Sequence, residues 1–236
     1  MTLQTLGQLP TNFSQLGNGI SKTAFGVDFP PIQSTFLNSM ILDGVIKYSL
    51  HHTTAPLIEV DTSELQHWFK VCRKYNLLGQ DPMRYDGAAY GNISQKLDTG
   101  FIITGTQVSG LDEIDNEQLC LVTQVDAANN QVYSEGPIKP SSESMTHATL
   151  YKADRAINAI IHVHSPELWA RDLPSTSPDI AYGTPEMAEA VAELLKDANV
   201  RELGCIRMGG HEDGILFFSE NMAQTGQKVV QIMEKS

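Results

Sequence analysis

The chain has few cysteines, and their arrangement fits neither disulfide pairing nor metal binding through thiolates. Cys72, Cys120 and Cys205 are the three cysteines, and no two of them form a CxxC pair. An odd and scattered set argues against a disulfide framework and against a thiolate zinc site. We therefore expect three free, buried thiols.

Long apolar runs are also lacking, since no stretch approaches the roughly 20 residues that a helix needs to cross a bilayer. Hydrophobic residues make up 41% of the chain and charged residues 19%, which is an ordinary globular composition. The segment Met1–Pro10 has neither the basic start nor the continuous apolar stretch of a secretory signal. These absences predict a soluble protein of the cytoplasm.

Basic residues are scarce. The chain has 16 Lys and Arg against 28 Asp and Glu, so its formal net charge is −12. This is the wrong sign for the phosphate neutralisation that dominates nucleic-acid affinity, and we expect no nucleic-acid or membrane partner. An anionic small molecule would need a local pocket of hydrogen-bond donors, because the global field does not attract it.

Hydrophobic periodicity and turn residues divide the chain into an arm and one domain. Residues 1–34 are rich in Gly, Asn, Ser and Thr without clear periodicity, which predicts an irregular N-terminal arm. Residues 35–236 are expected to form a single domain. Its predicted helices cover residues 35–50, 62–78, 142–157 and 185–198, and a stretch near the C-terminus. Its predicted strands cover residues 91–97, 101–104, 118–125, 131–134, 159–164, 204–208 and 215–218.

This order of elements predicts the fold class. Turn residues join two pairs of strands as hairpins, so the sheet is expected to be largely antiparallel. Thr184 and Pro185 indicate a helix start. Thr can cap the free backbone amides of the first turn, and Pro in that turn loses no hydrogen bond. We expect an α/β fold, a three-layer αβα domain with a central, largely antiparallel sheet.

The strand predicted for residues 159–164 carries a pair of histidines. Side chains alternate along a strand, so His162 and His164 project from one face while Ile161 and Val163 enter the core. Such a pair could bind a metal ion. Two polar residues at the end of a strand are an equally good interpretation of this pair alone.

Two further stretches supply a carboxylate and a third imidazole. Ser141–Glu143 lies at a predicted helix start, and Gly209–His211 lies between two predicted strands. Three imidazoles and one carboxylate suit a borderline ion such as Zn²⁺, although Mn²⁺, Co²⁺ or Fe²⁺ also fit. The sequence therefore predicts one divalent metal ion, most readily zinc. Its expected ligands are Glu143, His162, His164 and His211.

With these stretches the sequence resembles the class II aldolase/adducin family, whose best-known members are metal-dependent fuculose-phosphate and rhamnulose-phosphate aldolases. The resemblance spans roughly residues 60–220, in the family's order. The matching stretches are Gly91-Asn92-Ile93-Ser94, Ile103-Thr104-Gly105, Ser141-Ser142-Glu143 with His147 and Tyr151, His162-Val163-His164-Ser165-Pro166, Gly183-Thr184 and Gly210-His211.

The resemblance implies roles for residues in several of these stretches. The same four residues, Glu143 and the three histidines, would hold the metal. A phosphate pocket would be formed by Asn92, Thr104, Gly105, Ser141 and Ser142. Backbone amides and hydroxyls at a turn and at a helix N-terminus stabilise an anion without a lysine. Contact with the phosphate and turn geometry alone are equally good interpretations of Gly91 and Gly105.

The activity that the resemblance implies is that of a metal-dependent aldehyde-lyase acting on a small sugar phosphate or related hydroxy-carbonyl compound. The metal would grip carbonyl and hydroxyl oxygens and stabilise an enediolate, and Glu143 would loosen from it to act as the base. A homotetramer is also implied. The epimerase branch usually has Asp at the position of Glu143, so the aldolases match better, while a dehydratase or epimerase stays an alternative.

The chain departs from the aldolases between His164 and Gly183. Their longer segment supplies a catalytic tyrosine acid, and Tyr182 does not match its position. The proton donor is therefore unassigned, and a non-catalytic, adducin-like binding or structural protein remains an alternative. Retention of the metal ligands favours an enzyme. His147 lies one helical turn after Glu143, and we expect it to support the site or core rather than to bind the metal.

Overall fold

The structure is a computed structural model that describes residues 46–235, which lie within one compact unit. The arm predicted for residues 1–34 lies outside the described residues, as does most of the helix predicted for residues 35–50. The helices are α1 (Ser63–Lys74), α2 (Ser144–Ala153), α3 (Pro166–Trp169), α4 (Pro185–Leu194), α5 (Ala198–Leu203) and α6 (Met222–Glu234). Two short 3-10 helices are η1 (Tyr85–Gly87) and η2 (Asn116–Gln118).

The strands of the described region form a large sheet and a small one. They are β1 (Ser49–Thr54), β2 (Gly79–Gln80), β3 (Ala89–Tyr90), β4 (Asn92–Lys96), β5 (Phe101–Thr104), β6 (Leu119–Asp126), β7 (Gln131–Gly136), β8 (Ala159–His164), β9 (Cys205–Arg207) and β10 (Gly214–Ser219). The large sheet has eight strands in the order β1-β7-β6-β5-β4-β8-β10-β9, and β2 pairs with β3. Every pair in the large sheet is antiparallel except β1 with β7. The largely antiparallel sheet is thereby confirmed.

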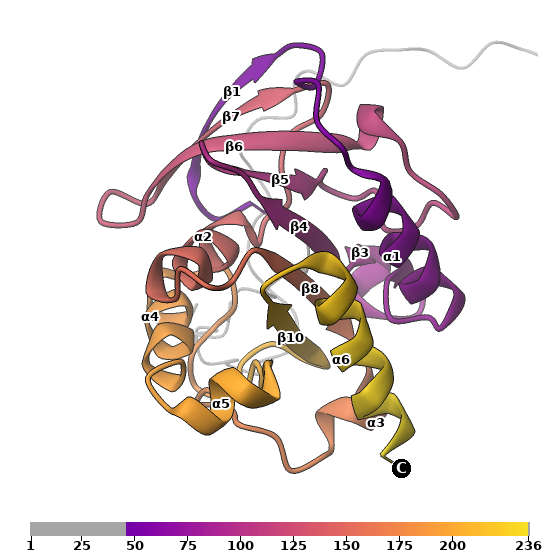
Figure 1. Cartoon of the computed structure of the whole chain (residues 1–236), viewed down its shortest axis with the longest axis vertical. Coiled ribbons are helices and arrows are strands. Elements are labelled where there is room, and N and C mark those ends of the chain that lie inside the picture. The colour runs from indigo at the N-terminus through magenta and orange to yellow at the C-terminus, as the bar shows by residue number, and fades with distance from the viewer. Residues whose placement is uncertain (1–45, 236) are drawn as a thin grey trace, which may run out of the picture. The chain divides into compact units, whose positions relative to one another are not determined.

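Helices cover both faces of this sheet (Figure 1). Helices α1 and α6 pack on each other and on β4, β8 and β10, whereas α2 packs on α4 and contacts β6. Because strand side chains alternate, each strand contributes to both interfaces. One core contains Phe69, Ile161 and Phe217. The other contains Met145, Leu216 and Phe218. The predicted three-layer αβα arrangement is therefore confirmed.

Several local predictions hold and four need correction. The β4/β5 and β6/β7 hairpins, strand β8 and the terminal helix lie where they were predicted. Thr184 caps α4, since its Oγ1 accepts a hydrogen bond from the Met187 amide at 3.3 Å. The three cysteines are free and buried. No helix between residues 46 and 235 is long and apolar enough to span a membrane.

The corrections concern four helices. The helix predicted for residues 62–78 ends at Lys74, and Asn76 beyond it has a φ of 55°, outside the helical region. Residues 49–50, expected at the end of a helix, begin strand β1, because parallel pairing with β7 satisfies their extended backbone. The helix predicted for residues 142–157 ends at Ala153, where Asp154 becomes extended. The helix predicted for residues 185–198 is two helices, because Asp197 caps a new one by accepting from the Asn199 amide at 2.8 Å.

Phe217→Ala tests the core on the α1/α6 side of the sheet. Phe217 is fully buried, so truncation should lower the free energy of unfolding by about 3–5 kcal/mol through lost burial and a residual cavity. Urea unfolding of the purified protein measures this loss. Tyr75→Ala, at a residue that is 52% exposed, should change the stability by less than about 0.5 kcal/mol. Equal effects of the two substitutions would contradict the assignment of this core.

Candidate metal centre

Strand register brings the predicted site residues together at one end of β8. His162 pairs with Asn92 of β4 on one side and with Leu216 of β10 on the other. His164 pairs with Gly214, at the start of β10. The turn between β9 and β10 carries His211 back toward the same strand end. Pairing in the sheet therefore collects residues that are far apart in the sequence.

Three imidazoles form a buried cluster at this end. One ligand nitrogen of each of His162, His164 and His211 lies within 4.8 Å of the others. The Nε2 atoms of His162 and His164 are 3.2 Å apart. Two imidazoles bound to one zinc at about 2.0–2.1 Å with tetrahedral geometry have their nitrogens about 3.3 Å apart. The observed spacing therefore fits two ligands of one metal ion.

The backbone fixes the direction in which His162 offers its lone pair. Its Nδ1 donates a hydrogen bond to the Ile215 carbonyl oxygen at 3.1 Å, which leaves Nε2 to face the cluster. Metal-binding histidines characteristically donate their second ring N–H to such an acceptor. Gly214 allows the rings to pack, because a Cβ there would lie 2.8 Å from His211 Nδ1 and 3.2 Å from His162 Cε1.

Burial keeps the imidazoles of His162 and His164 neutral. The cost of desolvating a charge, followed by the proximity of His211, holds the pKa of His162 and of His164 well below the usual value of 6.5. Only the unprotonated imidazole nitrogen can bind a metal ion. His162 and His164 are therefore in the ligating form at neutral pH.

Glu143 lines the same cavity as the three histidines. It occupies the N-cap position of α2, and its side chain is buried. The cavity brings together all four predicted metal ligands and four of the five predicted phosphate-binding residues. Its lining consists of Ala89, Gly91, Asn92, Gly105, Thr106, Gln107, Ser109, Ser141, Ser142, Glu143, His162, His164 and His211.

Thr104 is the predicted phosphate-binding residue that does not line the cavity. It is fully buried, and its Oγ1 accepts a hydrogen bond from the Ile93 amide at 3.1 Å. Thr106, two residues further on, lines the cavity instead. Gly91 fits both phosphate contact and turn geometry. It lines the cavity, and its φ of +75° favours glycine.

The lining around Ser141 and Asn92 is polar and buried. Ser141 Oγ accepts a hydrogen bond from the Glu143 amide at 3.4 Å, next to the first turn of α2. The Asn92 carboxamide oxygen is buried, and within residues 46–235 it has no hydrogen-bond partner. A buried polar atom of this kind is costly unless a ligand or water satisfies it. These groups can therefore contact a polar ligand in the cavity.

His147 lies in a hydrogen-bonded group under the site, as expected for a supporting residue. Ser94 Oγ is 2.6 Å from His147 Nδ1 and 2.6 Å from the Tyr151 hydroxyl. All three residues are buried. His147 is not part of the three-histidine group that could hold a metal.

Three tyrosines surround the imidazoles, and sequence reasoning gave none of them a role. The Tyr182 ring stacks on His211 with centroids 4.2 Å apart. Tyr85 packs edge-on against His164 at 4.7 Å, and Tyr90 lies 5.6 Å from the same ring. Tyr85 and Tyr90 lie outside the recognisable motifs, so no spacing pattern indicated them.

The metal-free protein should lose stability as the pH falls below about 6.5. Burial lowers the pKa of His147 from 6.5 to about 3, so below pH 6.5 the unfolded chain takes up a proton that the folded chain does not. His147 alone should then remove about 1.4 kcal/mol of stability per pH unit. Urea unfolding at pH 7, 6 and 5 measures the slope of the free energy of unfolding against pH, and His147→Asn should reduce this slope. An unchanged slope would show that His147 is already protonated in the folded state.

Comparison with known proteins bears on the family. Residues 70–175 match the family model described as Class II Aldolase and Adducin N-terminal domain. A relative from Cupriavidus necator, 3-oxo-tetronate 4-phosphate decarboxylase, is 33% identical over 93 residues, 38% of this chain and 38% of the relative. The match therefore spans well under half the length of that curated relative.

Solved structures share the fold. L-fuculose-1-phosphate aldolase from Thermus thermophilus has a TM-score of 0.53 and 19% identity, over 73% of this chain and 88% of that one. Another L-fuculose 1-phosphate aldolase has a TM-score of 0.54 and 21% identity, over 73% and 82%. YgbL from Escherichia coli has a TM-score of 0.53 and 20% identity, over 72% and 84%.

The described residues form an αβα domain with a buried cluster of three imidazoles at the end of a central strand, a set that could hold a metal ion. Residues 70–175 match the class II aldolase/adducin family model, and two fuculose-phosphate aldolases share the fold of the chain. The resemblance noted in the sequence is thereby confirmed.

Proposed function

We propose that the chain is a divalent-metal-dependent lyase of the aldolase type, which cleaves a carbon–carbon bond in a small sugar phosphate or related hydroxy-carbonyl compound. One observation carries the proposal. The three-imidazole cluster and Glu143 line a cavity whose remaining wall holds Asn92, Ser141 and Ser142. Metal ligands, a buried carboxylate and anion-binding groups are thus within reach of one small molecule.

His162, His164 and His211 would hold the ion, with Glu143 as the fourth ligand. Three neutral nitrogens and one carboxylate oxygen suit zinc or another divalent transition metal. When bound, such an ion supplies a Lewis acid that polarises the substrate carbonyl and stabilises the negative charge produced by bond cleavage.

Glu143 acts as the base in this proposal. Its carboxylate accepts the proton of the substrate hydroxyl on one side of the breaking bond, so that this carbon leaves as an aldehyde. The electron pair of the broken bond moves toward the substrate carbonyl. A proton returned to that fragment completes the reaction, and burial of Glu143 keeps water from competing for it.

The phosphate is assigned to the wall formed by Asn92, Gly105, Ser141 and Ser142. Ser141 and Ser142 precede α2, where helix amides point outward and favour an anion. This local set of donors suits a chain whose net charge is −12. Thr104 supports the wall indirectly, by holding the Ile93 amide.

Decarboxylation is a second candidate reaction, and the relative from Cupriavidus necator favours it. Loss of carbon dioxide from a 3-oxo acid moves an electron pair toward a carbonyl in the same way as aldol cleavage. A dehydratase or epimerase would use the same ligands. The adducin-like, non-catalytic alternative is less favoured, because the three imidazoles converge in the geometry of a metal site.

We further propose, from the family resemblance, that the protein is a homotetramer and lies in the cytoplasm. Light scattering of the purified protein would test the tetramer.

A substrate panel tests the proposed function. Zinc-loaded protein is incubated with ketose 1-phosphates and with phosphorylated 3-oxo acids, and release of aldehyde or of carbon dioxide is measured. We expect turnover of at least one compound, and none by the same protein carrying both His162→Ala and His211→Ala. Absence of cleavage, decarboxylation, dehydration and epimerisation by metal-loaded wild type would overturn the proposal.

A further inference from the structure

A charged group on two neighbouring loops borders the metal centre. The Tyr85 hydroxyl donates a hydrogen bond to Asp213 Oδ2 at 2.7 Å. Arg84 Nη2 lies 3.4 Å from the same carboxylate and also contacts the Tyr85 hydroxyl. Asp213 follows His211 by two residues, and Tyr85 packs on His164. The group therefore connects two of the imidazoles to one guanidinium.

The backbone of this group is unusual. Tyr85, Asp86 and Asp213 have φ values of 50°, 55° and 60°, although none of them is glycine. Non-glycine residues in this region are uncommon and gather at functional sites. The surrounding contacts hold Arg84 and Asp213 in a fixed relation to the imidazoles.

Arg84 retains hydrogen-bonding capacity that its neighbours do not use. Only Nη2 has a hydrogen bond, and the other N–H groups of the guanidinium have no partner among the described residues. The side chain is 29% exposed. Its Cζ lies 4.8 Å from the Tyr85 ring centroid and 5.0 Å from that of Tyr90, so two aromatic rings orient the guanidinium plane.

We propose that Arg84 is a specificity-determining residue that binds a substrate carboxylate at the rim of the metal centre. The inference rests on the proposed function and narrows its substrate to phosphorylated hydroxy or oxo acids. Their phosphate occupies the wall of Asn92, Ser141 and Ser142, and their carboxylate reaches Arg84. A single tyrosine ring separates Arg84 from His164, a spacing within the reach of an extended small substrate.

A carboxylate fits this position better than a second phosphate does. Guanidinium presents parallel N–H groups that match the two oxygens of a carboxylate. Asp213 reduces the local positive charge and contacts one nitrogen only, so a singly charged group is the better complement. The net charge of −12 repels anions from the chain as a whole, so Arg84 would attract a carboxylate specifically to this rim.

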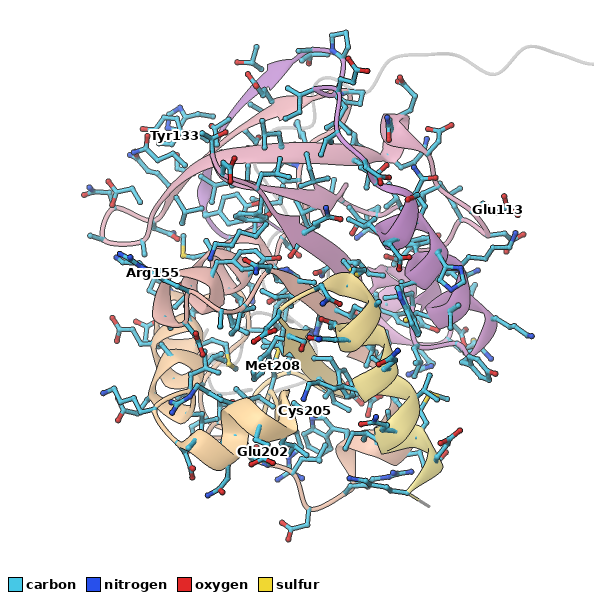
Figure 2. All side chains as sticks on the ribbon, in the orientation of Figure 1. Glu113, Tyr133, Arg155, Glu202, Cys205 and Met208 are labelled. Atoms are coloured by element: carbon cyan, nitrogen blue, oxygen red, sulfur yellow. The ribbon has the colours of Figure 1, made fainter. Side chains whose placement is uncertain are left out.

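Calorimetric titration with two matched probes tests this inference. 3-Phosphoglycerate has a phosphate, a hydroxyl and a carboxylate, whereas glycerol 3-phosphate lacks the carboxylate. Zinc-loaded wild type, Arg84→Gln, Arg84→Lys and Arg155→Gln are titrated with each probe. Arg155 is an exposed arginine at the outer edge of the molecule and serves as the matched control (Figure 2).

Wild type and Arg155→Gln should bind 3-phosphoglycerate about 10- to 100-fold more tightly than glycerol 3-phosphate, as expected for a charge-assisted pair. Arg84→Gln should lose this preference with an unchanged affinity for glycerol 3-phosphate, and Arg84→Lys should retain part of it. A preference that survives in Arg84→Gln would overturn the inference alone. An equal loss of affinity for both probes in Arg84→Gln would also overturn it, because Arg84 would then only support the site. Failure of wild type to bind either probe would overturn the proposed function as well.

Discussion

His162→Ala is expected to lower the affinity for zinc by more than about 100-fold, because it removes a direct ligand, and loss of a supporting outer group alone costs 10- to 100-fold. His162 is the central member of the cluster, lying 3.2 Å from His164 Nε2 and anchored to the Ile215 carbonyl. Turnover should fall with metal occupancy. Competition with a chromophoric chelator measures the affinity, and the substrate panel measures turnover.

The control is His67→Ala. His67 is exposed on α1 and contacts Trp68, outside the residues that line the cavity. Its removal should leave zinc affinity and turnover at wild-type values. If His162→Ala bound zinc as tightly as His67→Ala, the ion would be held elsewhere and the assignment of this centre would be wrong.

Glu143→Gln should lower the turnover number by about 10²- to 10⁴-fold, the range for removal of a general base. The amide has nearly the same shape but cannot accept the substrate proton. Zinc should still bind, since the three imidazoles remain. Steady-state kinetics and metal content of the same sample separate the two effects.

Glu202→Gln is the matched control for this change. Glu202, labelled in Figure 2, is exposed on α5, and its backbone carbonyl accepts a hydrogen bond from Lys228. This variant should behave as wild type. Wild-type turnover by Glu143→Gln would move the base to another residue, and loss of zinc from it would make Glu143 chiefly a ligand.

Local patterns in the sequence sufficed for the two hairpins and for the placement of the histidine pair on β8. Alternation along residues 159–164 places His162 and His164 on one face, and the structure has strand β8 at those bounds. The turn residues around Gly100 and Asn130 fixed the two hairpins, because positive φ values are needed there. These features depend on neighbours along the chain, which a single sequence displays.

Features that depend on tertiary contacts could not be predicted from local patterns in the sequence. The edge strand β1 exists because it pairs with β7, far along the chain. The Tyr85 contact with Asp213 joins loops separated by 128 positions. Thr104 belongs to a matched stretch, but its hydroxyl is engaged by the neighbouring strand, so a motif places it near the cavity without deciding which way its side chain points.

The central claim is that His162, His164 and His211 hold one divalent metal ion with Glu143. Elemental mass spectrometry of the full chain, purified without chelators and again after equilibration with zinc and desalting, tests this most directly. The account predicts about one zinc or other divalent metal per chain, as for a site of four protein ligands. A protein that stays metal-free after zinc is added would contradict it.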